Sequence, residues 1–249
     1  TEAAIDTAHV DADSTVILDA DDTSDIRSVA GAASYGGKAG IGAGVAISTV
    51  GSDTLARING GSVNGDAGVS ASATNDNDIF SVAAALGASQ GVAVSGSVTV
   101  NVISNRTEAS STGAVVTAGG NAVNLDADDI SDILSIAGSV ALSSGQAAVG
   151  IAAAYNEIDN DTSALATGST LSGTSVGIEA NESAQIGSYA VGGSGSAKVS
   201  VTGSLGINTI TNTTTLDIAA NGGTGIADAS GAVVRTILPD PSRSTCSSP

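Results

Sequence analysis

The sequence contains very few of the residues that build ordinary active sites and cores. It has one cysteine, Cys246, one histidine, His9, one Phe, three Tyr, three Pro, and no Trp or Met. A lone cysteine excludes a disulfide scaffold and a multi-cysteine zinc site. One histidine leaves little from which to assemble a nucleophile and its base. The interior has to be filled by Ala, Val, Ile, Leu and Gly, which predicts thin, closely packed, repetitive layers.

Basic residues are also scarce. Seven Lys and Arg stand against 25 Asp and Glu, and the formal net charge is −18. Such a surface repels phosphate backbones and anionic headgroups, so we expect no nucleic-acid partner. The apolar stretches are interrupted by Gly, Ser and Asn, which predicts no membrane insertion in this segment. Hydrophobic residues nevertheless make up 41% of the chain, enough to form a core. The 33 glycines lack the Gly-X-Y period of collagen.

One unit occurs four times, starting at Val16, Val69, Val123 and Val176, so the starts lie 53, 54 and 53 residues apart. The apolar positions keep their offsets from copy to copy, whereas the charged and glycine positions drift. Corresponding apolar sets are Ile26, Ile79, Ile133 and Ile186; Val29, Val82, Ile136 and Tyr189; Ile47, Val100, Tyr155 and Ile207; and Val50, Ile103, Ile158 and Ile210. A regular period of this kind indicates a repeat architecture.

The repeat defines the domain organisation. Residues 1–15 are interpreted as the end of a preceding repeat, followed by repeats at 16–68, 69–122, 123–175 and 176–221. Residues 222–249 are expected to form a partial repeat and an irregular tail, because Pro239 and Pro241 would disrupt strand ladders. The chain starts within the pattern, so we interpret it as a piece of a longer protein with flanking repeats.

The local patterns predict an all-β fold. Val16, Leu18 and Ala20 alternate with other residues as in a strand with one buried face, and the later copies keep this alternation. The acidic and amide-rich stretch that follows is predicted to be a turn. Two apolar strands joined by a glycine-containing loop come next. A repetitive β-solenoid of the parallel β-helix type fits best, and glycine-turned antiparallel hairpins within each repeat stay open as an alternative.

The period also predicts the size of the solenoid. Dividing 53 residues into two coils of about 26 gives roughly nine coils and a rod of about 45 Å.

The acidic stretches are the candidate metal sites. Calcium prefers clustered carboxylate oxygens, and two copies supply them: Asp21, Asp22, Asp25, Asp128, Asp129 and Asp132. The other interpretation is a solvated turn stabilised by local hydrogen bonds. Asp11 to Asp22 match the EF-hand ligand spacing in part, but Val16 occupies the position that needs Gly. The nonapeptide of calcium-binding β-rolls is absent.

Two polar positions recur with the apolar register. Asn101, Asn156 and Asn208 share one position, with Ser48 in the first copy, and are expected to form an amide ladder; a glycan-contacting row is the alternative. Thr54, Thr107, Thr162 and Thr214 share another, too sparsely for an ice-binding face. Acidic groups that recur in equivalent positions do not form one differentiated cleft, so we expect no enzyme and assign no catalytic or cofactor-binding residue.

Two segments carry a resemblance to known proteins. DIFSVAAALGASQGVAVSGSVTVNVISNRTEA and DILSIAGSVALSSGQAAVGIAAAYNEIDNDTSA resemble the repeats of large bacterial exoproteins: filamentous-haemagglutinin-like two-partner secretion proteins, leukotoxin-like repeats and autotransporter passengers. The resemblance covers roughly Val16 to Asn221. It implies a β-helical rod outside the cell or on a bacterial surface.

Three functional hypotheses follow. The first is a structural or adhesive rod segment of a secreted surface exoprotein, whose partner is a glycan or protein on a host or neighbouring cell. The second is a calcium-stabilised extracellular binding module. The third is a solenoid enzyme that acts on polysaccharide.

Overall fold

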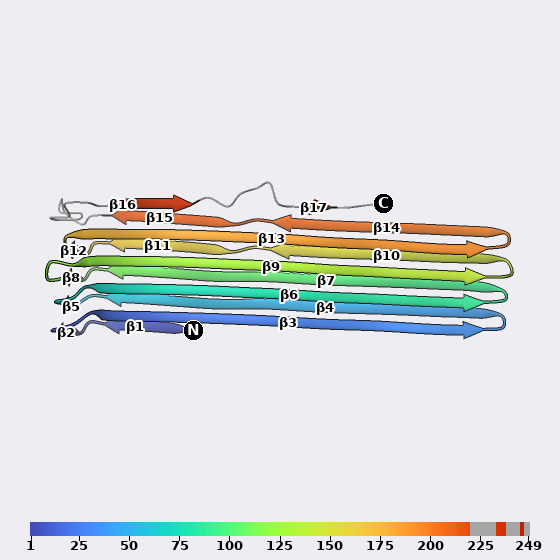
Figure 1. Ribbon diagram of the computed structural model, residues 1–249, viewed down its shortest axis with the longest axis horizontal. Helices are drawn as coiled ribbons and strands as arrows, with labels where there is room; N and C mark the ends of the chain where they lie inside the picture. Colours follow the sequence, from blue (N-terminus) through green and yellow to red (C-terminus); the bar gives the residue numbers. More distant parts are fainter. Residues whose placement is uncertain (220–232, 238–244, 247–249) are drawn as a thin grey trace.

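The computed structural model describes residues 1–219, 233–237 and 245–246, and in this part of the chain every regular element is a β-strand. All strand pairs are parallel, and each strand pairs with its equivalents in the neighbouring repeats. The fold is an all-β parallel β-solenoid, in which long strands run back and forth and the coils stack one upon another (Figure 1). The predicted fold class is confirmed.

Two of the three sheets contain the long strands. Sheet 1 has the order β16-β13-β9-β6-β3, with the bounds β3 Val16–Gly36, β6 Val69–Ser89, β9 Ala122–Ser143, β13 Ser175–Ser196 and β16 Val233–Ile237. Sheet 2 has the order β1-β4-β7-β10-β14, with the bounds β1 Glu2–Asp6, β4 Ala39–Asn59, β7 Val92–Thr112, β10 Ala147–Ile158 and β14 Val199–Ile210. In the same sheet, β11 (Asp161–Thr167) follows β10 along the coil, and β15 (Thr213–Ala219) follows β14.

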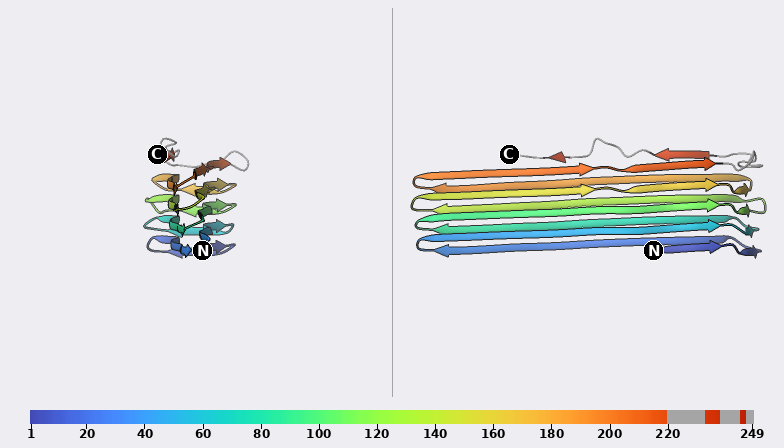
Figure 2. Two further views of the ribbon diagram at one scale, coloured as in Figure 1. Left: turned by 90° about the vertical axis from the view of Figure 1, so that its right-hand side faces the viewer. Right: turned by 180° about the vertical axis from the view of Figure 1, so that it is seen from behind.

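Short strands close one end of each coil. Sheet 3 has the order β12-β8-β5-β2, with the bounds β2 His9–Ala12, β5 Ser62–Gly65, β8 Val115–Thr117 and β12 Thr170–Ser172. β17 (Thr245–Cys246) pairs with β13. The expected partial repeat and tail, 222–249, lies outside the described residues except for β16 and β17. At the other end of the coil, tight turns link sheet 1 directly to sheet 2 (Figure 2).

The predicted coil size is wrong. Val16 is the register partner of Val69, so one coil uses the whole 53-residue repeat and not half of it. A strand of 21 residues at about 3.3 Å per residue spans about 70 Å, whereas each coil adds about 4.8 Å to the stack. The long dimension of the molecule therefore follows the strands.

The hairpin alternative is also wrong. The strands on either side of each glycine-containing loop, such as β3 and β4, run in opposite directions but belong to different sheets. They face each other through side chains and pair with other coils through their backbones. The loop is thus a corner between two stacked sheets.

The predicted acidic turn is a strand as well. β3 continues from Val16 to Gly36 without a break, and its burial alternates through the acidic stretch. Asp21 and Asp25 point outward, while Asp22 between them points toward the interior. Parallel pairing with the next coil supplies the backbone hydrogen bonds that a turn would otherwise have needed.

The apolar register deduced from the repeat is confirmed. The four sets of corresponding residues form four columns across the coils. Ile79, Ile103, Ile133, Ile158 and Ile186 are almost fully buried, and with Val50 they make one compact cluster between sheets 1 and 2. This isoleucine cluster separates two differently packed regions of the interior.

On the side of sheet 3, the interior is a conventional apolar core. Leu18, Ile58, Val63 and Leu125 are buried there among many alanines and valines. Three sheets enclose this space, so branched side chains fit inside. Within the described residues, no helix is long and apolar enough to span a lipid bilayer.

On the other side, the two long sheets approach so closely that only small side chains fit between them. A Cβ atom on Gly42 would lie 2.4 Å from the carbonyl oxygen of Leu86, and one on Gly150 would lie 2.1 Å from that of Gly193. Alanines such as Ala93, Ala141, Ala148 and Ala152 fill the rest. Large apolar side chains are displaced to the outer faces.

Candidate functional site

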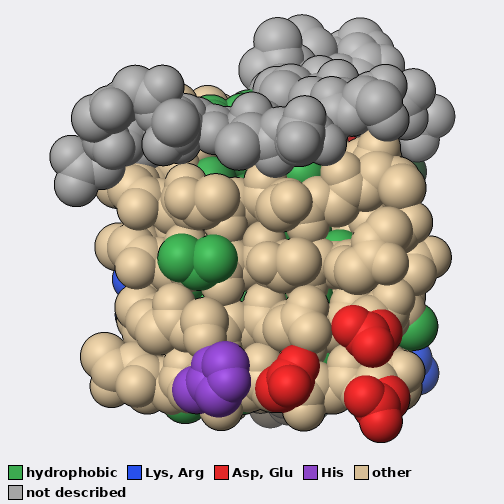
Figure 3. Space-filling view, turned by 90° about the vertical axis from the view of Figure 1, so that its left-hand side faces the viewer, with side chains coloured by type: hydrophobic (Ala, Val, Ile, Leu, Met, Phe, Trp, Pro, Cys, Tyr) green, Lys and Arg blue, Asp and Glu red, His purple; other side chains and the backbone are tan. Residues whose placement is uncertain are grey.

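Charge divides the molecule into two halves along the strands. We define the neutral half as segments 26–50, 79–103, 133–158 and 186–210, and the acidic half as the other described residues. The neutral half contains only four charged side chains, Arg27, Lys38, Glu157 and Lys198, so all of the 25 Asp and Glu except Glu157 lie outside it. Because the coils are in register, the boundary falls at the same place in each. Figure 3 shows the end of the acidic half, where acidic side chains and His9 lie on the first coils.

A buried polar cluster lies inside the acidic half. The carboxylate of Asp129 on β9 is only 1% exposed. It accepts hydrogen bonds from Asn160 Nδ2 at 2.7 Å, Ser131 Oγ at 2.9 Å, Thr107 Oγ1 at 3.0 Å and Asn105 Nδ2 at 3.3 Å. Burial raises the pKa of Asp129, and these hydrogen bonds act against that rise. The donors come from both long sheets, so the cluster ties the sheets together.

Glu182 on β13 continues the column of Asp129. The two residues are register partners in adjacent coils, and Glu182 is also buried. Its Oε2 accepts a hydrogen bond from Thr214 at 3.2 Å, while Oε1 has no partner within the described part of the chain. Burial, followed by repulsion from Asp129, raises the pKa of Glu182 to about 8. Glu182 therefore binds a proton at neutral pH.

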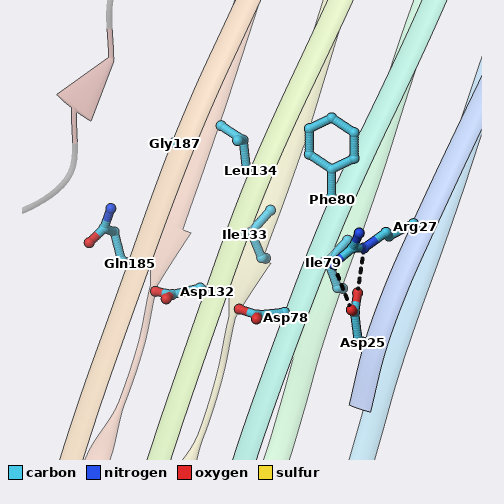
Figure 4. A pocket seen from close by; sticks show the side chains of 10 residues that line it. All are labelled: Asp25, Arg27, Asp78, Ile79, Phe80, Asp132, Ile133, Leu134, Gln185 and Gly187. Atoms are coloured by element: carbon cyan, nitrogen blue, oxygen red, sulfur yellow. Dashed lines mark hydrogen bonds and ion pairs between the residues drawn. The ribbon is translucent and has the colours of Figure 1, made fainter.

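An open groove of about 510 Å³ crosses the outer face of sheet 1 at the boundary of the two halves. Its walls come from equivalent positions in four successive coils. One row is Asp25, Asp78, Asp132 and Gln185, and the parallel row is Arg27, Phe80, Leu134 and Gly187 (Figure 4). The second row falls in size from Phe80 to Gly187, which opens the groove at the fourth coil.

The groove carries uncompensated negative charge. Arg27 is already engaged by Asp25, with Nη2–Oδ2 and Nε–Oδ1 distances of 3.0 and 3.1 Å. Partial burial, then repulsion from Asp78 and Asp76, raises the pKa of Asp132. Carboxylate acceptors beside a phenyl ring provide the two contacts that hydroxylated or cationic ligands require: hydrogen bonds or ion pairs, and a flat apolar surface.

The structure does not bring the six calcium candidates together. Asp21, Asp25 and Asp132 are exposed, Asp22 and Asp128 are half-buried, and Asp129 is inside the solenoid. In the intervening coil, Thr74 and Asn75 separate the first two members of one acidic set from those of the other. At the third position Asp78 lies between Asp25 and Asp132, and these three form the acidic row of the groove. Within residues 1–219 and the two short strands beyond, no group of three or more His, Cys, Asp or Glu has the geometry to hold a metal ion.

Both recurring polar columns lie in the interior. Asn101 Nδ2 donates to Asn156 Oδ1 at 2.7 Å, and Asn156 Nδ2 donates to Asn208 Oδ1 at 2.9 Å, which confirms the predicted amide ladder. Ser48 occupies the same column and hydrogen bonds with Ser28 at 2.9 Å. The threonine column includes Thr54, Thr107 and Thr162, which are fully buried. Neither column is available to a ligand from outside.

Sequence reasoning missed Glu182, Asn105, Asn160 and the groove residue Phe80. A signal for the interior position existed: Ala20, Asp22, Ser24 and Ile26 preserve the alternation of the strand through the acidic stretch. Phe80 had a different signal, because it is the only phenylalanine in the sequence and follows Ile79 of the buried column.

Comparisons with known proteins identify no relative of this chain. No protein-family model matches the sequence, no curated protein matches it, and no solved structure matches its fold. The class that the strands define is a parallel β-solenoid with one repeat per coil.

Proposed function

We propose that this chain is a structural and adhesive rod segment of a secreted bacterial surface exoprotein, located outside the cell or on the bacterial surface. The observation that carries the proposal is the groove on sheet 1. It is assembled from two rows of equivalent positions in four successive coils, and it combines carboxylate acceptors with the ring of Phe80. The repeat thus builds a continuous surface by varying the side chains at two fixed positions.

A glycan on a host or neighbouring cell is the partner that this groove suits best. Sugar rings pack their C–H faces on an aromatic ring, and their hydroxyls donate hydrogen bonds to carboxylates such as Asp78 and Asp132. The rest of the solenoid acts as the support, because each central strand is paired on both sides along its length.

Glycan-array binding and adhesion to cells test this function. We expect the wild-type protein to bind, Phe80→Ala together with Asp132→Asn to lose at least about tenfold in affinity, and Leu86→Ala to retain it. Leu86 is exposed on the same sheet but does not line the groove. The proposal fails if the wild-type protein binds neither glycans nor cells.

The calcium-stabilised binding module is the alternative. It has less support, because the six acidic candidates point in different directions and belong to two strands, β3 and β9, that are separated by β6. Enzymatic action on polysaccharide is the third hypothesis, and a reducing-sugar assay addresses it: turnover by the wild-type protein would replace the adhesive function.

A further inference from the structure

The outer face of sheet 2 in the neutral half is a continuous apolar surface. It is made by β4, β7, β10 and β14, whose outward side chains form columns across the coils. These columns are Ala39, Val92, Ala147 and Val199; Ile41, Val94, Val149 and Val201; Val45, Val98, Ala153 and Leu205; and Ile47, Val100, Tyr155 and Ile207. Ile41 is 69% exposed, Ile47 67% and Leu205 56%.

The size of this face suits a stable interface. Over the 12-residue length of β10 and β14, the four strands cover about 19 Å by about 40 Å, or roughly 750 Å². That area exceeds the largest apolar patch of a typical monomer, about 300–600 Å². It is close to the roughly 800 Å² that each partner contributes to a standard protein interface.

The charge distribution favours a second copy of the chain as the partner. With a net charge of −18, two copies repel each other over most of their surfaces. On this face the repulsion is small, because its only acidic residue is Glu157, at the boundary column. Two copies in opposite orientation would keep their acidic halves at opposite ends of the assembly.

The relief of the face is self-complementary. A low column of Ala43, Gly96, Ile151 and Gly203 runs between the ridges that contain Ile41 and Val45. Three of its four members are Ala or Gly, so a ridge of an identical face can enter it. Within each ridge the side chains repeat from coil to coil at about 4.8 Å on both copies, as in tightly interdigitated sheets.

We propose that two copies of this chain associate through the outer face of sheet 2 in the neutral half, face to face and related by a twofold axis. Each copy contributes the same patch, as a twofold interface requires. The association uses the sheet opposite the groove, so it leaves the groove open and does not depend on the adhesive function.

Sedimentation equilibrium of the purified chain tests the interface. We expect a dimer for the wild-type protein, and at least about tenfold weaker dimerisation for Val98→Glu. The matched control is Leu86→Glu on sheet 1, since Val98 and Leu86 are 37% and 41% exposed. The control should dimerise as the wild type does. Dimerisation should strengthen with added NaCl, because salt screens the repulsion between acidic halves.

A second variant keeps the proposal testable if Val98→Glu fails to fold. Val45→Glu places the charge on the outermost coil, where Val45 is 57% exposed, and should also give a monomer with unchanged strand content by circular dichroism. A wild-type protein that stays monomeric at high micromolar concentration overturns the proposal. Equal weakening of dimerisation by Val98→Glu and Leu86→Glu also overturns it. A wild-type protein that stays monomeric and floats with lipid vesicles overturns it too, because this face would then bind lipid.

Discussion

The acidic half and the neutral half obey opposite packing rules although the same strands run through both. In the acidic half, three sheets enclose branched apolar residues and a hydrogen-bonded carboxylate cluster, and charges cover the outside. In the neutral half, beyond the isoleucine cluster at its boundary, two sheets enclose mainly Gly, Ala and Ser and the asparagine ladder, and the other large apolar residues lie outside. The difference shows that inter-sheet distance decides which residues are buried: a narrow gap excludes large side chains regardless of their hydrophobicity.

The largest expected effect comes from forcing the narrow gap open. Gly150→Val should destabilise the protein by about 3 kcal/mol or more, because its Cβ would lie 2.1 Å from the carbonyl oxygen of Gly193. Gly138→Val is the control, since a Cβ there meets nothing within 4 Å and valine favours strands. Urea unfolding measures both. Equal stability of the two variants would mean that the sheets are not held this close.

A smaller loss is expected from the polar cluster of the acidic half. Asp129→Ala should cost about 2 kcal/mol, because the amide groups of Asn105 and Asn160 lose a buried acceptor. Asp21→Ala, at an exposed position of the same strand stretch, should change the unfolding free energy by less than about 0.5 kcal/mol. If the two substitutions cost the same, the buried cluster does not stabilise the acidic half.

The raised pKa of Glu182, in the acidic half, predicts that the stability of the protein depends on pH. Its pKa is about 8 in the folded protein against 4.5 for a free glutamate side chain, so the folded state binds the proton more tightly. The stabilisation is complete below pH 4.5 and is lost as the pH rises through 8. The unfolding temperature should therefore fall by several degrees between about pH 5 and about pH 9.

Glu182→Gln is the matched variant for this dependence. Glutamine keeps the shape of the protonated acid and cannot titrate, so most of the fall in unfolding temperature over this range should disappear. Asp126, whose pKa is raised to about 6 chiefly by burial, then by Asp128 and Glu179, should leave a weaker dependence at lower pH. An unchanged profile in Glu182→Gln would show that other groups cause the pH dependence.

The smallest expected effect is that of calcium removal. The calcium candidates do not converge, so EDTA should leave the unfolding temperature within about one degree of its value in calcium. Differential scanning calorimetry with and without chelator makes the measurement. A fall of several degrees on adding EDTA would favour the calcium-stabilised module and would place a cation in the acidic half.

Local patterns predicted the parallel β class and the register, because apolar residues that stack on their own copies keep fixed offsets. The columns of Ile79 and Val100 were visible as repeated positions for this reason. The acidic stretch was misinterpreted because consecutive Asp residues also favour turns, and only pairing with the adjacent coil decides between the two. The groove could not be predicted, since it depends on side-chain size in four coils at once.

By itself the sequence determined the period, the all-β class and the amide ladder of Asn101, Asn156 and Asn208. Only the tertiary structure decided that one coil uses the whole repeat, that Asp129 and Glu182 lie inside, and that the large apolar residues of the neutral half beyond the isoleucine cluster lie outside. The physical reason is that alternation shows which residues share a face of a strand. Which face is buried depends on how closely the second sheet approaches, and that distance is set by both sheets together.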